Sequence, residues 1–307
     1  MSVLMIGPEA ERHLTWQGLC DALQAGHRLP TAEIGDTLLY RGADVLLSRS
    51  AWIDGLGLAV KSATVFPGNK AIGKPAVNGA VNLYSDQTGE LEAIVDFHLV
   101  TKWKTAGDSL LAASLLARAD SKQILLVGAG TVARSMVDAY RSRFPGARFT
   151  VWNRSAAAAE AMAHEVPGVT VAHDLAEAVA AADIICTATM ATEPLIRGEW
   201  LRPGTHLDLI GAYRPDMREV DDEALRRSRI FVDARATTLH HIGELKDPLA
   251  RGVITETDVV ADFYDIASGR FARRGATDIT LAKNGGGAHL DLMVARYVMA
   301  AWQAAQR

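Results

Sequence analysis

The stretch that decides the fold is Ile124-Leu125-Leu126-Val127-Gly128-Ala129-Gly130-Thr131-Val132-Ala133-Arg134. Strand-favouring residues run directly into Gly-x-Gly-x-x-Ala, and apolar residues at helical spacing follow. The first glycine permits a tight turn, the second lets the backbone approach a pyrophosphate, and the small alanine lets the helix pack closely on the strand. The pattern predicts a dinucleotide site; the alternative is a glycine turn in an ordinary α/β protein. The predicted cofactor contacts in this stretch are Gly128, Gly130, Thr131, Val132 and Ala133.

After this loop the chain alternates between helical and extended patterns. We expect helices over 131–143, 155–164 and 174–181, and strands over 149–152, 169–172, 184–187, 206–211 and 230–233, with a further candidate strand over 277–281. Such alternation is typical of a doubly wound parallel sheet, which is the α/β Rossmann architecture.

The residues before the loop have a different character. The pattern predicts a helix over 9–25, then strands over 44–49, 58–66, 77–84 and 91–100, with a hairpin tip at 85–90. This spacing favours an antiparallel or mixed sheet. A helix over 105–119 leads into the glycine loop, and a long apolar helix over 288–306 follows three glycines. A helix this apolar must pack against another part of the protein, and we expect it to pack on the first domain.

Length and composition limit the possible functions. The 307 residues suggest two domains, and the net charge of −4 gives no basic surface for nucleic acid. No apolar run reaches the length of a membrane span, and the first residues lack the pattern of a signal peptide. The two cysteines, Cys20 and Cys186, fit no metal or redox spacing, and we expect them to be reduced core residues of a cytoplasmic protein.

The residues after the second Rossmann strand indicate which dinucleotide binds. NAD sites normally carry a carboxylate there, which binds the ribose hydroxyls. Here the strand ends in Asn153-Arg154-Ser155. An arginine can bind a 2′-phosphate bidentately and stack on adenine, so these three residues favour NADP(H) over NAD(H). The alternative is that Arg154 is only a solvated charge.

Several stretches together resemble the ornithine cyclodeaminase/mu-crystallin family. They are Gly57–Lys61 with Thr64–Asn69, Val100–Ala106, Val127–Gly130, Val151–Arg154, Thr187–Thr189, Gly211–Glu219 and Lys283–Gly286. The resemblance implies an α/β substrate-binding and dimerisation domain over 1–116 with 288–307, and an NADP-binding Rossmann domain over 117–287. It also implies a homodimer and a hydride transfer between a nicotinamide and the α-carbon of an amino or imino acid.

The resemblance marks Lys61 and Lys104 as candidates for both catalysis and substrate binding. A lysine can pair with a substrate carboxylate, or protonate a reacting nitrogen if burial lowers its pKa. The family normally has arginine at position 104. Lysine keeps the charge, but it cannot bind both oxygens of a carboxylate as a guanidinium does. Thr105 either caps a helix or donates to the carboxylate. A carboxylate-binding arginine is expected near the first strands; Arg49 is preferred, with Arg28 and Arg41 as alternatives.

Tyr213 departs most from the family pattern. Cyclodeaminases have an aspartate at the matching position, where it acts as a base, and a phenol cannot replace a carboxylate at neutral pH. Asp216 lies beyond a proline and is not expected to reach the same point. We keep Tyr213 as a catalytic candidate, but the substitution argues against deamination.

Two further segments are expected to line the cofactor. Thr187, Ala188 and Thr189 end a Rossmann strand and are predicted to contact the nicotinamide ribose. Lys283 is a candidate for holding the carboxamide, and Asn284 for holding substrate; the alternative is an interdomain hinge. His240, His241 and Glu244 resemble a metal pair in spacing, but no third ligand is evident, so we predict no metal.

The sequence therefore predicts an NADPH-dependent reductase of cyclic imino acids, with Δ1-pyrroline-2-carboxylate as the leading substrate. Three alternatives remain: an ammonia-lyase of the ornithine cyclodeaminase type, an amino-acid dehydrogenase, and a non-catalytic NADPH-binding protein of the crystallin type. A small imino or amino acid is the expected partner in each of the enzymatic cases.

Overall fold

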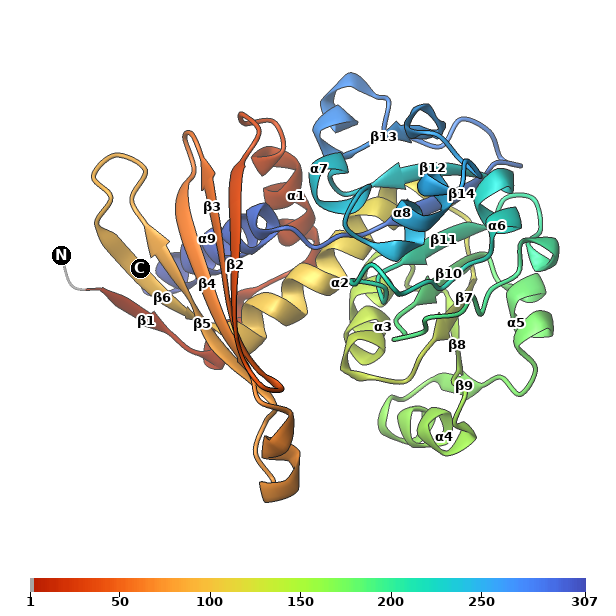
Figure 1. Ribbon diagram of the computed structural model, residues 1–307, viewed down its shortest axis with the longest axis horizontal. Coiled ribbons are helices and arrows are strands. Elements are labelled where there is room, and N and C mark those ends of the chain that lie inside the picture. The colour runs from red at the N-terminus through yellow and green to blue at the C-terminus, as the bar shows by residue number, and fades with distance from the viewer. Residues whose placement is uncertain (1–2) are drawn as a thin grey trace. The chain divides into compact units, whose positions relative to one another are not determined.

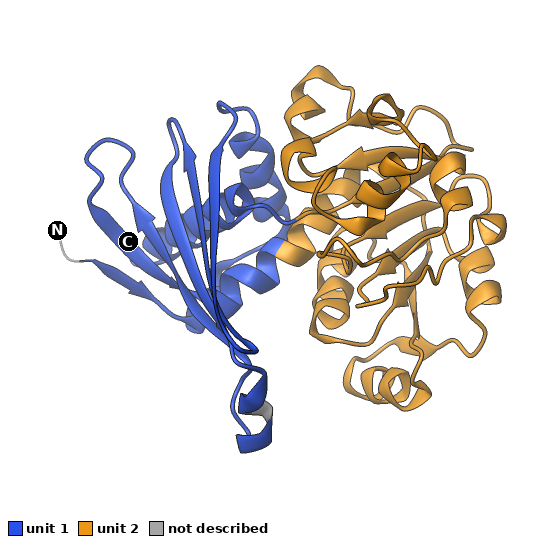
Figure 2. Ribbon diagram, in the orientation of Figure 1, with its two compact units in different colours: residues 1–104, 286–307 blue, residues 105–285 orange. Residues whose placement is uncertain are grey.

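The computed structural model describes residues 3–307, apart from the side chain of Lys70. The chain forms two compact units, Met1–Lys104 with Gly286–Arg307 (unit 1) and Thr105–Gly285 (unit 2), as Figure 2 shows. The first boundary lies inside a helix at Lys104, whereas the sequence placed it after residue 116. The first turns of that helix pack within unit 1, because Trp103 stacks on Trp16 there with ring centroids 4.0 Å apart.

Unit 1 is built on a six-stranded sheet (Figure 1). Its spatial order is β1 (Leu4–Ile6), β6 (Leu91–Asp96), β5 (Val77–Tyr84), β4 (Gly57–Val65), β3 (Asp44–Ile53) and β2 (Glu33–Arg41). β1 pairs parallel with β6, and all other neighbours are antiparallel. This confirms the mixed sheet that the turn signals predicted, including the hairpin between β5 and β6.

Strand register brings three charged residues onto one face of this sheet. Arg49 of β3 lies opposite both Asp36 of β2 and Lys61 of β4, and opposite residues point to the same side. The C-terminal helix α9 (Ala288–Ala305) packs on β3 and β4 and on α1 (Trp16–Gly26). The prediction that the terminal helix docks on the first domain is therefore confirmed.

Three local predictions in unit 1 are wrong. The helix expected over 9–25 is two helices, η1 (Pro8–His13) and α1, because the Thr15 hydroxyl caps a new start by accepting from the Gly18 N–H. The strand expected over 91–100 ends at Asp96, whose carboxylate accepts from the Leu99 N–H and begins α2 (Phe97–Leu116). The strands β1 and β2 were missed; every residue of β2 is exposed, so it carries no core pattern.

Unit 2 contains an eight-stranded sheet in which every pairing is parallel. Its order is β13 (Val259–Ala261), β12 (Ser228–Val232), β14 (Ile279–Lys283), β11 (His206–Leu209), β10 (Ile184–Thr187), β7 (Gln123–Val127), β8 (Arg148–Trp152) and β9 (Val169–Val171). The helices are α3 (Thr131–Arg143), α4 (Ala156–Glu165), α5 (Leu175–Ala181), α6 (Asp222–Arg227), α7 (Arg235–Thr238) and α8 (Gly243–Ala250). This is the predicted doubly wound Rossmann sheet.

Both faces of this sheet are covered. Leu207 and Leu209 point into a core that includes Val179, Leu225 and Leu245, from α5, α6 and α8. The intervening Asp208 points to the opposite face, where the Tyr140 hydroxyl of α3 donates to its carboxylate. The strand expected over 277–281 runs instead from Ile279 to Lys283, in the interior of the sheet between β11 and β12.

Two other expectations concern the chain as a whole. Cys20 and Cys186 are buried thiols in different units, which agrees with the reduced core residues expected. Within residues 3–307, no helix combines the length and hydrophobicity needed to span a membrane.

Candidate active site

Three cationic side chains of unit 1 gather around one buried carboxylate. Arg49, Lys61 and Lys104 come from β3, β4 and α2, and the carboxylate is Asp291 in the first turn of α9. One oxygen of Asp291, Oδ1, lies 3.0 Å from the ammonium of Lys61 and 3.0 Å from that of Lys104. We call these four residues the cation cluster. It unites three of the predicted substrate-binding residues.

Asp291 was missed by the sequence analysis. Its signal was present: a single acidic residue stands in an otherwise apolar helical segment just after Gly285-Gly286-Gly287. A carboxylate on the buried side of a helix needs a partner of opposite charge, because burying a lone ionised group is costly. The partners of its side chain are Lys61 of β4 and Lys104 of α2, and only the folded chain shows this.

The ammonium of Lys61 is held on several sides. It donates to the Thr101 hydroxyl at 2.9 Å and to Asp291 at 3.0 Å, and it lies 4.7 Å from the centre of the Phe97 ring. Lys61 as a whole is only 6% exposed to solvent. Burial lowers the pKa of Lys61 to about 8, and the charge of Lys104 acts in the same direction, while Asp291 opposes both. Lys61 can therefore give up a proton near neutral pH.

The charge of Asp291 is secured by its neighbours. Burial alone would raise the pKa of Asp291, but the charges of Lys104, Lys61 and Arg49 hold it below the ordinary value. Its second oxygen, Oδ2, is buried and has no hydrogen-bond partner among residues 3–307. With three cations against this one buried anion, the cluster is suited to a second carboxylate.

Arg49 is also bound to the carboxylate of Asp36, through Nε and Nη2 at 2.8–3.1 Å. Its Nη1 donates to the Gly286 carbonyl at 2.9 Å, and Lys104 donates to the same oxygen at 3.1 Å. Of the three arginines considered, Arg49 alone joins the lysines. Arg28 is exposed beyond α1, and Arg41 pairs with Asp44 at the far end of the hairpin.

Thr105 does not cap a helix. It lies in the middle of α2, half-buried, because that helix begins eight residues earlier at Phe97. Thr105 is the first residue of unit 2, whereas Lys104 belongs to unit 1. A direct part of Thr105 in substrate binding stays a prediction.

The glycine loop of unit 2 has the conformation that a dinucleotide site needs. Gly128 has φ +113°, which disfavours any other residue, and a Cβ there would lie 2.6 Å from the Ala188 carbonyl oxygen. Gly130 is different: it is exposed, and a Cβ there would meet nothing within 4 Å. Its missing side chain leaves open space at the N-terminus of α3, where the exposed Thr131 begins the helix. The residues present fit a bound pyrophosphate.

The residues after β8 are open to solvent. Arg154 and Ser155 are exposed, and the Asn153 amide donates to the Ser155 carbonyl at 3.1 Å. The Arg154 guanidinium has no ion pair or hydrogen bond within residues 3–307. No carboxylate or carbonyl of these described residues therefore competes for this cation. Val132 is half-buried and Ala133 buried in the first turn of α3, the latter as close helix packing requires.

Other predicted residues are less accessible. Thr187 is buried at the end of β10, while Ala188 and Thr189 are half-buried. Lys283 is fully buried, and its ammonium donates to the carbonyls of Leu209 and Asn284 at 2.9 and 2.7 Å. A direct contact between Lys283 and a carboxamide is therefore not supported, because the end of β14 lies in the interior of the sheet.

Asn284 is also buried in unit 2. Its amide nitrogen donates to Asp208 at 2.7 Å and to the Ser109 hydroxyl at 3.1 Å, while its Oδ1 has no hydrogen-bond partner within residues 3–307. Burial raises the pKa of Asp208 to about 6, against the hydrogen bonds that lower it. This placement gives Asn284 a structural part, and substrate contact stays a prediction.

Tyr213 and the histidine pair belong to unit 2. Tyr213 is 61% exposed, and the adjacent Arg214 binds Asp216 at 2.8 Å. His240 pairs with Glu256 at 3.1 Å, while Glu244 is buried and accepts from the N–H groups of Glu219 and Val220. Two of the three side chains whose spacing resembled a metal pair, His240 and Glu244, are thus engaged with different partners.

The comparisons with known proteins identify the family. Residues 52–306 match the model of the ornithine cyclodeaminase/mu-crystallin family. The chain is 50% identical over 296 residues to a Δ1-pyrroline-2-carboxylate reductase of Paracoccus denitrificans, covering 94% of each chain.

Two solved structures are also similar to this chain. One is a Thermococcus litoralis Δ1-pyrroline-2-carboxylate reductase in complex with NADH and L-proline, with a TM-score of 0.89, 26% identity and coverage of 99% of this chain and 98% of that one. The other is an archaeal alanine dehydrogenase dimer with bound NAD, with a TM-score of 0.89, 26% identity and coverage of 100% and 98%. By its sequence and its fold, the chain belongs to the ornithine cyclodeaminase/mu-crystallin family.

Proposed function

We propose that the chain is an NADPH-dependent reductase of a cyclic imino acid, with Δ1-pyrroline-2-carboxylate as substrate and proline as product. The observation that carries the proposal is the cation cluster: two buried lysines and the half-buried Arg49 exceed in charge the carboxylates of Asp291 and Asp36, and so offer a site for a small carboxylate. The 50% identity to a reductase of this name supports the choice of substrate. The imino acid is assigned to unit 1 and the dinucleotide to unit 2.

The reaction adds a hydride to the imine carbon and a proton to its nitrogen. A bound NADPH would supply the hydride and would thereby be oxidised to NADP⁺. The chain's own residues bind, orient and protonate. Arg49 and Lys104 hold the substrate carboxylate, and Lys61, whose pKa is about 8, delivers the proton. Fixing the imine in this way lowers the barrier mainly by orientation and by electrostatic stabilisation.

The preference for NADPH is part of this proposal. The support is the exposed Arg154, with Asn153 and Ser155 beside it and no carboxylate after β8. An unpaired guanidinium can bind a 2′-phosphate at two oxygens, whereas a ribose hydroxyl gains much less from it. The related reductase of T. litoralis is in complex with NADH, so the preference must be measured on this chain.

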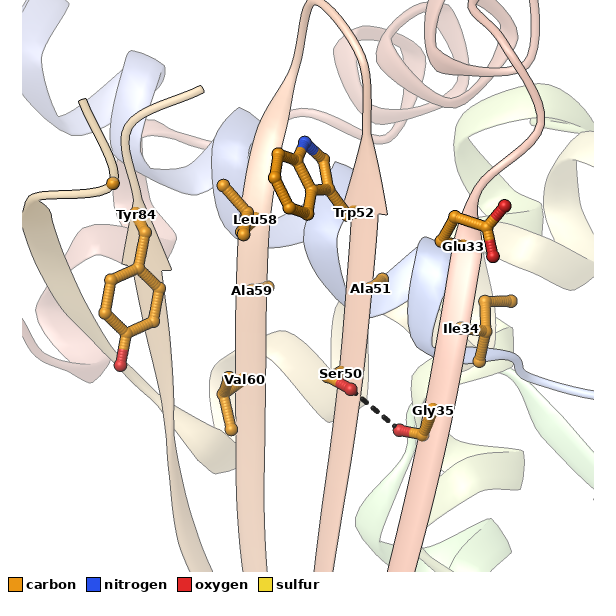
Figure 3. Close-up of a pocket in the computed structure, with 11 residues that line it drawn as sticks. Glu33, Ile34, Gly35, Ser50, Ala51, Trp52, Leu58, Ala59, Val60 and Tyr84 are labelled. Carbon is orange, nitrogen blue, oxygen red and sulfur yellow. Dashed lines mark hydrogen bonds between the residues drawn. The ribbon is translucent and has the colours of Figure 1, made fainter. Parts of the chain in front are cut away.

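A homodimer is also proposed, through the outer face of the sheet in unit 1. That face is opposite to α9 and carries a hollow of about 460 Å³. Figure 3 shows the side chains of Trp52, Leu58, Val60 and Tyr84 that line it. Trp52 is 49% exposed. An exposed apolar patch on a sheet favours association with a second copy, and the similar alanine dehydrogenase is a dimer.

The test is a screen for NADPH oxidation over cyclic imines, over α-keto acids with ammonia or amines, and over ornithine. We expect turnover with Δ1-pyrroline-2-carboxylate and none with ornithine, since residue 213 is not a carboxylate. Turnover that requires free ammonia would identify an amino-acid dehydrogenase instead. Ammonia release from ornithine would identify a cyclodeaminase. NADPH binding without oxidation by any imine would identify a crystallin-type binding protein.

A further inference from the structure

We propose that Glu219 is a positioning residue for the dinucleotide. This inference rests on the proposed function. In it, the buried carboxylate of Glu219 fixes the loop Thr187–Thr189 against the glycine turn at Gly128. Neither the motifs of the sequence nor the site described above assigns a part to this residue.

The carboxylate of Glu219 receives four hydrogen bonds from two loops. Its Oε1 accepts from the N–H and the hydroxyl of Thr189, at 2.9 and 2.8 Å. Its Oε2 accepts from the N–H groups of Gly211 and Ala212, at 2.8 and 3.1 Å. These loops follow β10 and β11, so one carboxylate joins the carboxyl ends of two neighbouring strands. Ligands of doubly wound sheets bind at this edge.

The loop that Glu219 holds is packed directly on the glycine turn. The Ala188 N–H donates to the Val127 carbonyl at 2.8 Å, and a Cβ on Gly128 would come within 2.6 Å of the Ala188 oxygen. Gly211 is just as confined, because a Cβ there would lie 2.3 Å from Glu219 Oε1 and from the backbone of Thr189. A shift of Thr189 would therefore be transmitted to Gly128.

Glu219 is itself held rigidly. Its N–H donates to the Glu244 carboxylate at 2.7 Å, and its carbonyl accepts from the N–H groups of Leu195 and Ile196, each at 3.0 Å. The buried ammonium of Lys283 interacts electrostatically with the carboxylates of Glu219 and Glu244, and also with those of Asp233 and Asp108. The role of Lys283 is therefore electrostatic, within unit 2, and does not require contact with a ligand.

The hydrogen bonds require a carboxylate at this position. All four partners donate, and both oxygens are used. In Glu219→Gln the amide nitrogen must face two donors, so one of the two loops is released. Each hydrogen bond to the carboxylate that is lost makes the ordered position of these loops less stable. We therefore expect the dissociation constant of NADPH to rise about tenfold or more.

The experiment measures dinucleotide binding without substrate, by titrating the fluorescence of NADPH with the intact chain. It also measures KM for Δ1-pyrroline-2-carboxylate at saturating NADPH, and the unfolding temperature. A positioning role predicts a weaker NADPH complex in Glu219→Gln with little change in KM for the imino acid. Glu160→Gln, an exposed residue of α4, is the matched control and should leave all three values unchanged.

The outcomes separate this inference from the proposed function. A wild-type chain that binds no dinucleotide overturns both. A wild-type chain that binds NADPH, with Glu219→Gln binding equally well, overturns only the role of Glu219, even if the unfolding temperature falls. If Glu219→Gln does not fold, Glu219→Asp keeps the charge but withdraws the carboxylate from the two loops; weaker binding supports the inference, and unchanged binding contradicts it.

Discussion

The ammonium of Lys61 lies 3.0 Å from the carboxylate of Asp291, and both groups are almost completely buried. The same oxygen is shared with Lys104, so a single anion balances two cations. A third cation, Arg49, completes the cluster, and this surplus of positive charge is what makes the site attractive to a substrate carboxylate.

Reduction should slow as the pH rises through about 8, because the ammonium of Lys61 both attracts the substrate carboxylate and supplies the proton. The other charged groups facing it are Lys104, Arg49, Asp36 and Asp291. Burial holds the pKa of the adjacent His289 well below its ordinary value, so this imidazole does not titrate in the same range. The measurement is kcat/KM for the imine against pH, and a flat profile up to pH 10 would exclude Lys61 as proton donor.

Replacing Asp291 by asparagine should shift that alkaline limb to lower pH, by about one unit. The reason is that Asp291 raises the pKa of Lys61, against burial and Lys104, which lower it. The variant should also lose roughly 3–5 kcal/mol of unfolding free energy, because two buried ammonium groups lose their counter-ion. Chemical denaturation measures the second effect. An unshifted limb would mean that Asp291 serves folding alone.

Replacing Arg49 by methionine should raise KM for the imino acid by roughly 10- to 100-fold, since a charge-assisted bond to the carboxylate is lost. Steady-state kinetics at saturating NADPH give this value. Arg41→Met is the matched control: this arginine sits on the same strand hairpin but pairs with Asp44 and is 79% exposed. Equal effects of the two substitutions would remove Arg49 from the substrate site.

Replacing Arg154 by serine should weaken NADPH binding by roughly 10- to 100-fold and leave NADH binding nearly unchanged, because only the 2′-phosphate depends on the guanidinium. Competitive binding titrations with the two cofactors measure the ratio. Arg148→Ser, at the exposed start of the same strand, serves as control. Equal affinity of the wild type for NADH and NADPH would refute the assignment.

Replacing Asp183 by asparagine should lower the unfolding free energy of unit 2 by about 1–3 kcal/mol. Burial raises the pKa of Asp183, but the N–H groups of Lys122 and Gln123, with Arg202 and Arg118, hold it below the ordinary value. A lowered pKa means that the carboxylate stabilises the fold above about pH 4 and loses this effect as the pH falls through the folded value. The difference between wild type and variant should therefore shrink in acid, as denaturation curves at several pH values would show.

Much of unit 2 could be predicted because its signals are local. The glycine turn, the apolar strands and the helices between them follow from short-range patterns, and a parallel βαβ series allows few topologies. The order of β7, β10 and β11 and the exposed turn at Gly130 agree with that expectation. The strand β14 was placed two residues too early, and that shift matters because it puts Lys283 in the sheet interior.

Unit 1 was harder to predict where its signals depend on partners. The strand β2 has no buried residue, so its sequence carries no alternation. The helix α2 begins after Asp96, whose carboxylate accepts from the Leu99 N–H. Apolar residues on both sides of Asp96 gave this segment the pattern of one continuous strand. Asp291 was missed because its counter-ions are distant in the sequence. Lys61 lies 230 residues before it, and Lys104 is also far from it along the chain.

The sequence by itself determined the family, the doubly wound sheet and the glycine turn, because these depend on residue types at fixed short spacings. Only the tertiary structure decided which charged groups meet. Strand register set Arg49 beside Lys61, the C-terminal helix returned to bring Asp291 between the lysines, and burial then lowered the pKa of Lys61. Contacts between residues far apart in the chain are fixed by packing and by charge balance, which no local pattern records.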